Sequence, residues 1–294
     1  MSLSPASLRH SAEGLSAALP ALLVAAETLA NSALPGAHGR RRPGAGAEFW
    51  QFRPVAAGDG AGRIDWRRSA RGDDIFVRET EWQAARAVAL WADAGAAMDY
   101  SGASGRDTKA RRAQLLAMAL ALVLLRGGER VGLARPDFPP RAGTMQANIL
   151  AQALAGQRAA QEHTLPDLRA VPAGGHAVLM SDFLGPIEPL ETVLAQATGR
   201  NLRGLLVQIL DPSEEAFPFD GRTRFESMSG HLTHETLRAS DLRGQYCQRL
   251  AARKDRLAHL ARHTGWQFAT LHTDRPATEG LMWLYHAIGS GRRR

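Results

Sequence analysis

The feature that most constrains the fold is an alternation of short apolar runs with helical patterns over residues 84–294. The runs are "AVALWAD" (87–93), "RVGLARP" (130–136), "AVLMSD" (177–182), "LRGLLVQILD" (202–211) and "WQFATLHTD" (266–274). Long helical patterns lie between them, the clearest over 108–128 and 241–265. Runs that are apolar on both faces need cover on both faces, so the alternation predicts an α/β fold with a doubly wound, mainly parallel sheet.

Residues 36–83 follow a different pattern. "EFWQFRPV", "RIDWRRSA" and "DIFVRET" each alternate large apolar with polar residues, and Gly-Asp pairs between them indicate turns. We therefore expect a linker and a small antiparallel β unit of two or three strands over 36–83. The residues before it, 1–35, are predicted to be an N-terminal helical segment.

A period-two stretch interrupts the later sheet pattern at 217–240. It alternates around Asp220-Gly221 and Ser229-Gly230, which are turn-forming pairs. We expect a β-hairpin insertion at about 217–240 within the larger domain of 84–294.

The chain has a formal net charge of +7, but this charge does not form a basic stripe. Nearly all of its basic residues are arginines, and they are interleaved with acids except at "GRRRPG" (39–44) and at the C-terminal "GRRR". A nucleic-acid-binding surface needs a concentrated basic patch, so nucleic acid is not expected as a partner.

The sequence also predicts no integral membrane segment. The longest apolar stretch near the N-terminus, residues 17–30, is interrupted by Pro20 and Glu27 and is shorter than the roughly 20 apolar residues that a membrane span needs. Cys247 is the only cysteine, so no disulfide framework is expected. We expect a soluble, cytoplasmic protein.

Four of the apolar runs end in an acid: Asp93, Asp182, Asp211 and Asp274. In open α/β sheets ligands bind beyond the carboxyl ends of the strands, where the strand order reverses. If the strands before Asp93 and Asp182 flank that point, these two carboxylates converge on one crevice. Acids that follow strands also serve as N-caps of the next helix, and this is the favoured interpretation of Asp211 and Asp274.

The stretch "HGRRRPGAGAEFWQFRPVAAGDGAGRIDWRRSARGDDIFVRETEW", together with "VLMSDFLGP" and "LLVQILDPSEEAFPFDGRTRF", resembles the DUF58 family. The resemblance runs from about residue 36 to the C-terminus, and "GDGAGRIDWRRSAR" is its most specific motif. It implies a von Willebrand factor A-like domain and a partnership with a MoxR-type AAA+ ATPase, which is usually encoded beside members of this family.

The resemblance also implies a divalent-cation site. Metal-binding A-domains use a DxSxS loop after the first strand, a threonine from a second loop and an aspartate after the fourth strand, and the matching residues here are Asp93, Thr144 and Asp182. Gly95 and Ala97 stand where that motif has serines. Two oxygen ligands are therefore missing, and we expect at most weak Mg²⁺ binding with water filling the coordination shell, and no other cofactor.

From the resemblance we expect a non-enzymatic adaptor that acts with a MoxR-type AAA+ ATPase in chaperone-like remodelling, assembly or metal insertion of a client protein. One alternative is a metal-ion-dependent protein-binding A-domain with a weakened cation site. A further alternative is a hydrolase that uses Asp93 and Asp182, although paired carboxylates alone define neither a nucleophile nor a base.

The charged and aromatic stretch 48–79 is the candidate docking surface. Arginine stacks on tryptophan and binds carboxylates with a planar fork, which suits a partner that carries acids. The structural alternative is that these arginines form cross-strand ion pairs, with Trp66 and its aromatic neighbours packed towards the larger domain. The candidate partner-binding residues are Arg53, Arg63, Asp65, Trp66, Arg67, Arg71 and Arg78.

Overall fold

The computed structural model describes two compact units of the chain, each considered by itself below. The described residues are Ala26, Thr28, 43–44, 48–56, 59–60, 62, 64–72, 74–81, 85–157, 159–230 and 232–290. The smaller unit, called the β unit, spans 37–86, and the larger, called the sheet unit, contains the rest. The predicted helical segment 1–35 and the linker from 36 lie outside the described residues, apart from Ala26 and Thr28.

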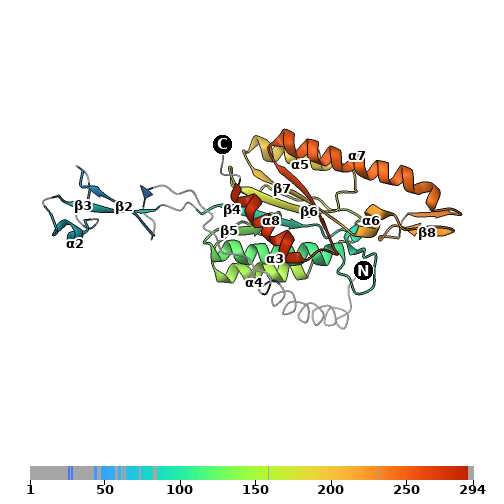
Figure 1. Cartoon of the computed structure of the whole chain (residues 1–294), viewed down its shortest axis with the longest axis horizontal. Coiled ribbons are helices and arrows are strands. Elements are labelled where there is room, and N and C mark those ends of the chain that lie inside the picture. The colour runs from blue at the N-terminus through green and yellow to red at the C-terminus, as the bar shows by residue number, and fades with distance from the viewer. Residues whose placement is uncertain are drawn as a thin grey trace. The chain divides into compact units, whose positions relative to one another are not determined.

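The sheet unit consists of strands that alternate with helices (Figure 1). Its strands are β4 (Ala87–Ala92), β5 (Arg130–Leu133), β6 (His176–Ser181), β7 (Arg203–Leu210), β8 (Thr223–Glu226), β9 (Thr233–Thr236) and β10 (Gln267–His272). Its helices are η2 (Ala96–Asp99), α3 (Lys109–Arg126), α4 (Thr144–Ala155), α5 (Glu188–Gly199), α6 (Pro212–Ala216), α7 (Ser240–Thr264) and α8 (Ala277–Ser290). None of the described helices is both long and apolar enough to cross a bilayer.

Five of these strands form a parallel sheet in the order β10-β7-β6-β4-β5, which confirms the predicted parallel sheet. Four of the five lie within one of the apolar runs of the sequence, and β6 begins one residue before its run, at His176. The strand order reverses between β4 and β6, which are direct neighbours. This pair therefore forms the switch point of the sheet, and the residues just beyond both strands share one edge.

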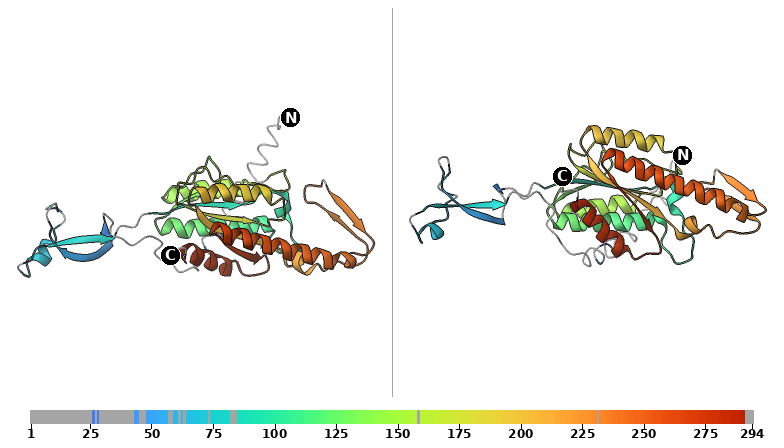
Figure 2. Two further views of the ribbon diagram at one scale, coloured as in Figure 1. Left: turned by 90° about the horizontal axis from the view of Figure 1, so that it is seen from above. Right: turned by 45° about the horizontal axis from the view of Figure 1, so that its top comes forward.

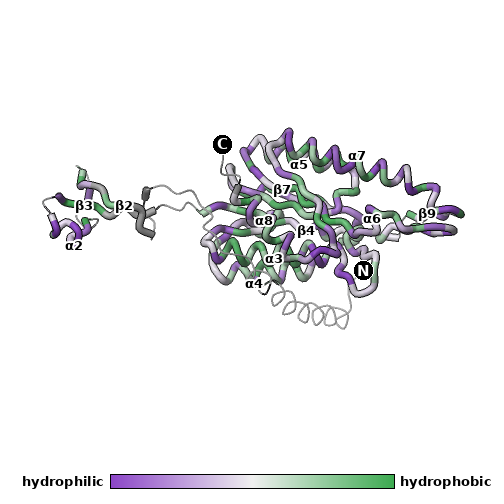
Figure 3. The backbone as a smooth tube through the Cα atoms, viewed as in Figure 1, coloured by the Kyte–Doolittle hydropathy of each residue, from purple (hydrophilic) through white to green (hydrophobic). Residues whose placement is uncertain are grey.

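Helices cover both faces of the sheet (Figure 2), and each face has its own apolar core. Successive residues of β4 enter different cores: Val88 and Leu90 pack with α3, α4 and α8, whereas Ala89 and Trp91 pack with α5 and α7. Figure 3 shows the result as hydrophobic strands and a hydrophobic α3, against a largely hydrophilic α7. Because both faces are covered, β4, β6 and β7 are buried along almost their whole length rather than at every second residue.

Helix α4 was not predicted, and it moves Thr144 away from the expected site. Gly143, with φ of 100°, precedes Thr144, and Gln146 in the first turn donates to the carbonyl of Val131. Val131 also forms an antiparallel bridge with Arg141. Helix α4 therefore begins beside the start of β5, at the edge of the sheet opposite to the carboxyl ends of the strands.

The predicted hairpin is present as β8 and β9, paired antiparallel from Thr223↔Thr236 to Glu226↔Thr233. Gly230 at its tip has φ of 77°, a conformation that glycine adopts without strain. At its base Phe217 packs on Phe225 and on Tyr246 of α7, with ring centroids 5.7 and 4.9 Å apart. The hairpin, seen beyond α6 in Figure 1, is thus anchored by aromatic contacts at its base.

The β unit is antiparallel, as predicted, but one of its expected strands is a helix. Strand β3 (Phe76–Glu81) pairs with β1 (Pro43–Gly44) and with β2 (Glu48–Pro54). The segment "RIDWRRSA", predicted as a strand, instead contains helix α2 (Trp66–Ser69). The side chain of Asp65 caps this helix by accepting from the amide of Arg68, at 3.0 Å, so the local N-cap outweighs the alternation of the pattern.

Candidate functional site

The candidate site lies at the carboxyl edge of the sheet, around the switch point. Asp93 and Asp182 each follow directly on one of the two switch-point strands, and the amide of Asp93 donates to the carbonyl of Met180 in β6, at 2.9 Å. Both aspartates are buried, with 2% and 0% exposure. The structure therefore brings these two sequence-predicted carboxylates to one edge, but it gives them different surroundings.

Asp93 is held entirely by neutral donors. One carboxylate oxygen accepts from the amide of Gly95 at 2.9 Å and from the hydroxyl and amide of Thr164 at 2.5 and 3.3 Å. The other oxygen accepts from the hydroxyl of Ser181 at 2.7 Å. These four hydrogen bonds compensate the buried carboxylate without a counter-ion.

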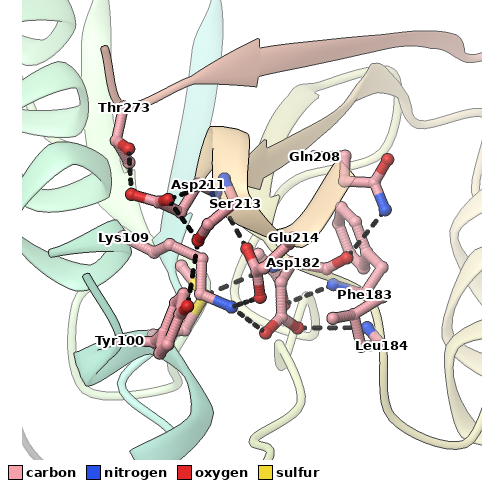
Figure 4. A network of polar contacts seen from close by, with 12 residues as sticks. Tyr100, Lys109, Asp182, Phe183, Leu184, Gln208, Asp211, Ser213, Glu214 and Thr273 are labelled. Atoms are coloured by element: carbon pink, nitrogen blue, oxygen red, sulfur yellow. Dashed lines mark hydrogen bonds and ion pairs between the residues drawn. The ribbon is translucent and has the colours of Figure 1, made fainter. Parts of the chain in front are cut away.

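Asp182 instead belongs to an ion triad, which we define as Lys109, Asp182 and Glu214 (Figure 4). The ammonium of Lys109 lies 2.8 Å from Asp182 and 2.6 Å from Glu214, and Lys109 is only 1% exposed. The second oxygen of Asp182 accepts from the amide of Leu184, at 3.0 Å. Lys109, the first residue of α3, thus places its buried ammonium at the end of β6.

Burial and the neighbouring charges shift the pKa values of Lys109 and Glu214. Burial by itself would lower the pKa of Lys109, but the charges of Asp182 and Glu214 and their hydrogen bonds raise it above its ordinary value. Burial raises the pKa of the Glu214 carboxyl, against the opposing effect of Lys109. The ammonium therefore remains charged at neutral pH and neutralises one of two carboxylates.

A second polar network, centred on Asp211, adjoins the triad (Figure 4). The Asp211 carboxylate accepts from the amide and hydroxyl of Ser213, the guanidinium of Arg106 and the hydroxyl of Thr273, at 2.7–3.2 Å. Although burial opposes it, these bonds from Ser213 and Arg106 hold the pKa of Asp211 well below its ordinary value. Asp211 and Glu214 also form the capping box of α6, which confirms the predicted N-cap role of Asp211.

The predicted set of magnesium ligands is not brought together. Thr144 lies at the opposite edge of the sheet, and a lysine ammonium, not an open coordination position, faces Asp182. Among the described residues no group of three or more His, Cys, Asp or Glu side chains could hold a metal ion. The donor set present therefore fits an internal ammonium better than a divalent cation.

The structure also explains why position 95 of the Asp93 loop is glycine rather than serine. The amides of Ala96 and Ala97 donate to the carbonyls of Gln161 and Glu162, so a neighbouring segment packs directly against this loop. A Cβ at Gly95 would come within 2.4 Å of the Glu162 carbonyl oxygen. No side chain fits at position 95 without moving that segment.

The predicted docking residues of the β unit are partly described. Trp66 is 62% exposed, and Arg67 and Arg71 are exposed as well. Arg67 lies in helix α2 and Arg71 lies in the turn after it, so the predicted cross-strand ion pairs of these two arginines are wrong. Asp65 is the cap of α2 rather than an ion-pair partner across strands. Arg63 lies outside the described residues, and of Arg53 and Arg78 only the backbone is described, in β2 and β3.

Two further contacts were missed by the sequence analysis. The guanidinium of Arg68 lies over the rings of Phe52 and Phe76, at 4.5 and 5.1 Å, and joins α2 to the strands beneath it. The ion triad was missed because Lys109 and Asp182 are 73 positions apart. A signal was present, since Lys109 is one of only two lysines among 36 basic residues.

Comparison with known proteins places this geometry in a family context. The model of the family described as "Protein of unknown function DUF58" matches residues 51–256. Two relatives described as uncharacterised, from Mycobacterium bovis and Mycobacterium tuberculosis, are each 28% identical over 297 residues, covering 95% of this chain and 90% of the relative. A third, from Mycobacterium avium, is 32% identical over 101 residues, which is 34% of this chain and 59% of that protein.

Two solved structures were also matched. One is an aerotolerance-related membrane protein from Bacteroides fragilis, 12% identical, with a TM-score of 0.40. The other is the conserved hypothetical protein BatB from Bacteroides thetaiotaomicron, 11% identical, with a TM-score of 0.36. Both matches cover 69% of this chain and 97% of the other chain.

Proposed function

The chain belongs to the DUF58 family, and from that premise we propose that it is a non-enzymatic interaction protein that acts with a MoxR-type AAA+ ATPase. Its role would be the chaperone-like remodelling, assembly or metal insertion of a client protein. In this proposal the sheet unit is a von Willebrand factor A-like domain. The reversal of strand order between β4 and β6, and the antiparallel Val131–Arg141 bridge at the β5 edge, support that fold.

The observation that carries the proposal is the surface of helix α2. Trp66 is 62% exposed and stands next to Arg67, with Arg71 exposed one turn later. Tryptophan and arginine are the residue types most enriched among the energetically dominant residues of protein interfaces. An exposed tryptophan followed by exposed arginines fits a partner surface that carries carboxylates.

Two features of the site argue against the two alternatives. A metal-dependent binding site would need Asp182 to face an open position, but the Lys109 ammonium fills that place. A hydrolase would need an activated, accessible nucleophile. Ser181 is only 3% exposed, and its hydroxyl donates a hydrogen bond to the carboxylate of Asp93. Both features favour a scaffold that presents surfaces to other proteins.

An affinity pull-down from the native cell, with and without ATP and followed by mass spectrometry, tests the proposal. The tagged wild-type chain should recover a MoxR-type AAA+ ATPase, and the Arg67→Glu/Arg71→Glu variant should not. Arg262→Glu/Arg275→Glu is the matched control, because it makes the same change in charge at exposed positions of the sheet unit. Failure of the wild-type chain to recover an AAA+ ATPase in either condition would refute the proposed function.

The same experiment separates the function from the assignment of its surface. If the Arg67→Glu/Arg71→Glu variant keeps its circular dichroism spectrum and still recovers the ATPase as the control does, α2 is not the docking surface. Loss of recovery together with loss of the spectrum would instead assign these arginines a structural role, and the surface assignment would again be wrong.

A further inference from the structure

A pocket opens at the switch point, on the face of the sheet covered by α5 and α7, and we name it the switch-point pocket. It has a volume of about 200 Å³. Its apolar walls come from β4, from the segment between α4 and β6, from the loop after β6 and from the start of α5. The wall residues that matter here are Trp91, Leu165, Phe183, Ile187, Pro189 and Leu190.

The floor of this pocket offers no free polar group for a ligand. Asp93 and Ser181 lie there, but the carboxylate already accepts four protein hydrogen bonds and the serine hydroxyl is the donor of one of them. The serine oxygen also accepts from the amide of Phe183, at 3.1 Å. Recognition in the interior of the pocket must therefore come from the apolar walls.

The volume indicates what kind of group fits. Pockets that hold whole small molecules or cofactors typically measure about 300–1,000 Å³. At about 200 Å³ the switch-point pocket is smaller than that range. A single large apolar side chain fits such a volume better than a complete cofactor does.

The rim of the pocket is basic. Arg253 of α7 lies at the rim, half-buried, and its Nη2 donates to the carbonyl of Gly185 at 2.8 Å. No carboxylate of the described residues pairs with Arg253, so the remaining N–H groups of its guanidinium can bind a carboxylate of a ligand. The imidazole of His163 packs against Gly185, where a Cβ would approach within 2.7 Å of the ring, so this glycine lets both rim residues lie close to the opening.

Exposed apolar residues lie both at the pocket and on the hairpin. Glu162, which lies in the same segment as Leu165, accepts from the amide of Ser229 at 2.9 Å and so joins the hairpin tip to the pocket. Leu165 is 52% exposed, and on the hairpin Met228 is 47% and Leu232 73% exposed. Exposed apolar side chains near a basic rim fit a protein-binding surface better than a solvated loop.

We propose that the switch-point pocket binds a partner peptide in which a large apolar side chain lies next to acidic residues. The apolar side chain enters between Trp91 and Leu165, and a neighbouring carboxylate pairs with Arg253 at the rim. This inference rests on the proposed function, since it names the chemistry of the segment that an interaction protein would capture. It adds a second contact surface, distinct from that of helix α2.

Titration of the full chain with synthetic peptides by calorimetry tests this site. The probe is acetyl-Glu-Phe-Glu-Leu-amide, and the controls are acetyl-Lys-Phe-Lys-Leu-amide, which lacks the acids, and acetyl-Glu-Ser-Glu-Ser-amide, which lacks the apolar groups. We expect only the first peptide to bind. Arg253→Glu and Leu165→Glu should each weaken its affinity by about tenfold or more.

The matched control is Arg262→Glu, on the same helix but roughly 13 Å further along its axis, which should change the affinity by less than about twofold. If Arg253→Glu fails to fold, Leu165→Glu still tests the site, because Leu165 is half-exposed and its substitution should not disturb the fold. Absence of binding at millimolar peptide, or binding that neither Arg253→Glu nor Leu165→Glu weakens, would overturn the proposal.

The outcomes also distinguish this site from the proposed function. If the acidic apolar peptide binds as expected while the pull-down recovers no AAA+ ATPase, the pocket assignment holds and the proposed function fails. If the ATPase is recovered equally by the wild-type chain and by Leu165→Glu, and the peptide does not bind, the pocket assignment alone fails.

Discussion

Asp93 and Asp182 occupy equivalent positions, each just beyond one of two neighbouring parallel strands, yet the protein compensates their charges by opposite means. Asp93 receives four hydrogen bonds from neutral donors, whereas Asp182 faces the ammonium of Lys109. The donors of Asp93 come from two loops, at Gly95 and Thr164, and from Ser181 at the end of β6. The partner of Asp182 comes from the first residue of a helix on the other face of the sheet.

This difference determines what each side of the sheet edge can do. On the side of α3 the buried charges of the ion triad pair with one another and fill the crevice, so this side contributes to stability. On the side of α5 and α7 the Asp93 carboxylate accepts four hydrogen bonds from neighbouring protein groups, and the pocket beside it is lined by apolar walls with Arg253 at its rim. The following predictions test whether the two carboxylates are as different as their surroundings indicate.

Removal of the internal cation should have the largest effect. Lys109→Met leaves Asp182 and Glu214 buried without a counter-ion, and breaking such a pair costs about 3–5 kcal/mol. The free energy of unfolding, measured by urea denaturation at neutral pH, should fall by that amount. Lys109→Met/Asp182→Asn/Glu214→Gln should recover more than half of the loss, because it leaves no unpaired buried charge.

The control for this experiment is the only other lysine. Lys254 pairs with Glu215, the residue next to Glu214, but both partners are about a third exposed. Because water screens this pair, Lys254→Met should cost no more than about 1 kcal/mol. If the two lysine variants lost equal amounts of the free energy of unfolding, burial would not be what determines the contribution of the triad to stability.

The contribution of Asp211, at the same edge of the sheet, should depend on pH in the acidic range. Hydrogen bonds to a buried carboxylate contribute roughly 2–3 kcal/mol, so Asp211→Asn should lower the free energy of unfolding by about this amount at neutral pH. The pKa of Asp211 is depressed in the folded protein, so its contribution is present above the ordinary pKa of 3.8 and is lost as the pH falls through the lower, folded value.

The stability gap between wild type and Asp211→Asn should therefore narrow below the ordinary pKa of 3.8. Urea denaturation of both proteins at several acidic pH values measures this gap. A gap that stays constant with pH would show that the aspartate acts through packing or capping alone.

The neutral donors of Asp93 should each matter less than the ammonium of Lys109. Ser181→Ala removes one of four hydrogen bonds to the carboxylate, with an expected cost of about 1–2 kcal/mol. Ser101→Ala is a suitable control, because its hydroxyl bonds only to the carbonyls of Ala103 and Arg106 near solvent, and it should cost about 0.5 kcal/mol or less. A loss for Ser181→Ala as large as that for Lys109→Met would remove the distinction between the two carboxylates.

The sheet was predictable from the sequence because its signal is local. A strand buried on both faces needs a continuous apolar run, and β4, β6, β7 and β10 each coincide with such a run. The convergence of Asp93 and Asp182 followed from the rule that ligands bind where the strand order reverses. These features depend only on residues that are close together along the chain and on general properties of parallel sheets.

The features that were missed depend on contacts between distant segments or on very short elements. The closure of the Asp182 crevice requires α3 to begin above the end of β6, which no spacing in the sequence encodes. Thr144 was assigned through the resemblance, whereas its position depends on where the chain turns after β5. In "RIDWRRSA" a helix of four residues is too short to show its own period, so the alternation of residue types was misleading and Asp65 was the informative residue.

Helix α2 offers the smallest expected effect on stability, in a comparison of two adjacent arginines. Arg68 lies over Phe52 and Phe76, so Arg68→Ala should lose about 0.5–1 kcal/mol of local stability. Arg67 is exposed, so Arg67→Ala should change stability by less than about 0.5 kcal/mol. Hydrogen exchange at the amide of Phe76, which donates to the hydroxyl of Ser69 in α2, measures this difference locally.

The effects of the two substitutions on partner binding should rank in the opposite order to their effects on stability. Arg67→Ala should weaken recovery of the AAA+ ATPase more than Arg68→Ala does, because the Arg68 guanidinium is already engaged by aromatic rings whereas that of Arg67 is exposed to a partner. If Arg68→Ala affects both exchange and recovery while Arg67→Ala affects neither, the arginines of this motif serve the fold of the β unit. The docking surface would then have to lie elsewhere, and the switch-point pocket would become the stronger candidate.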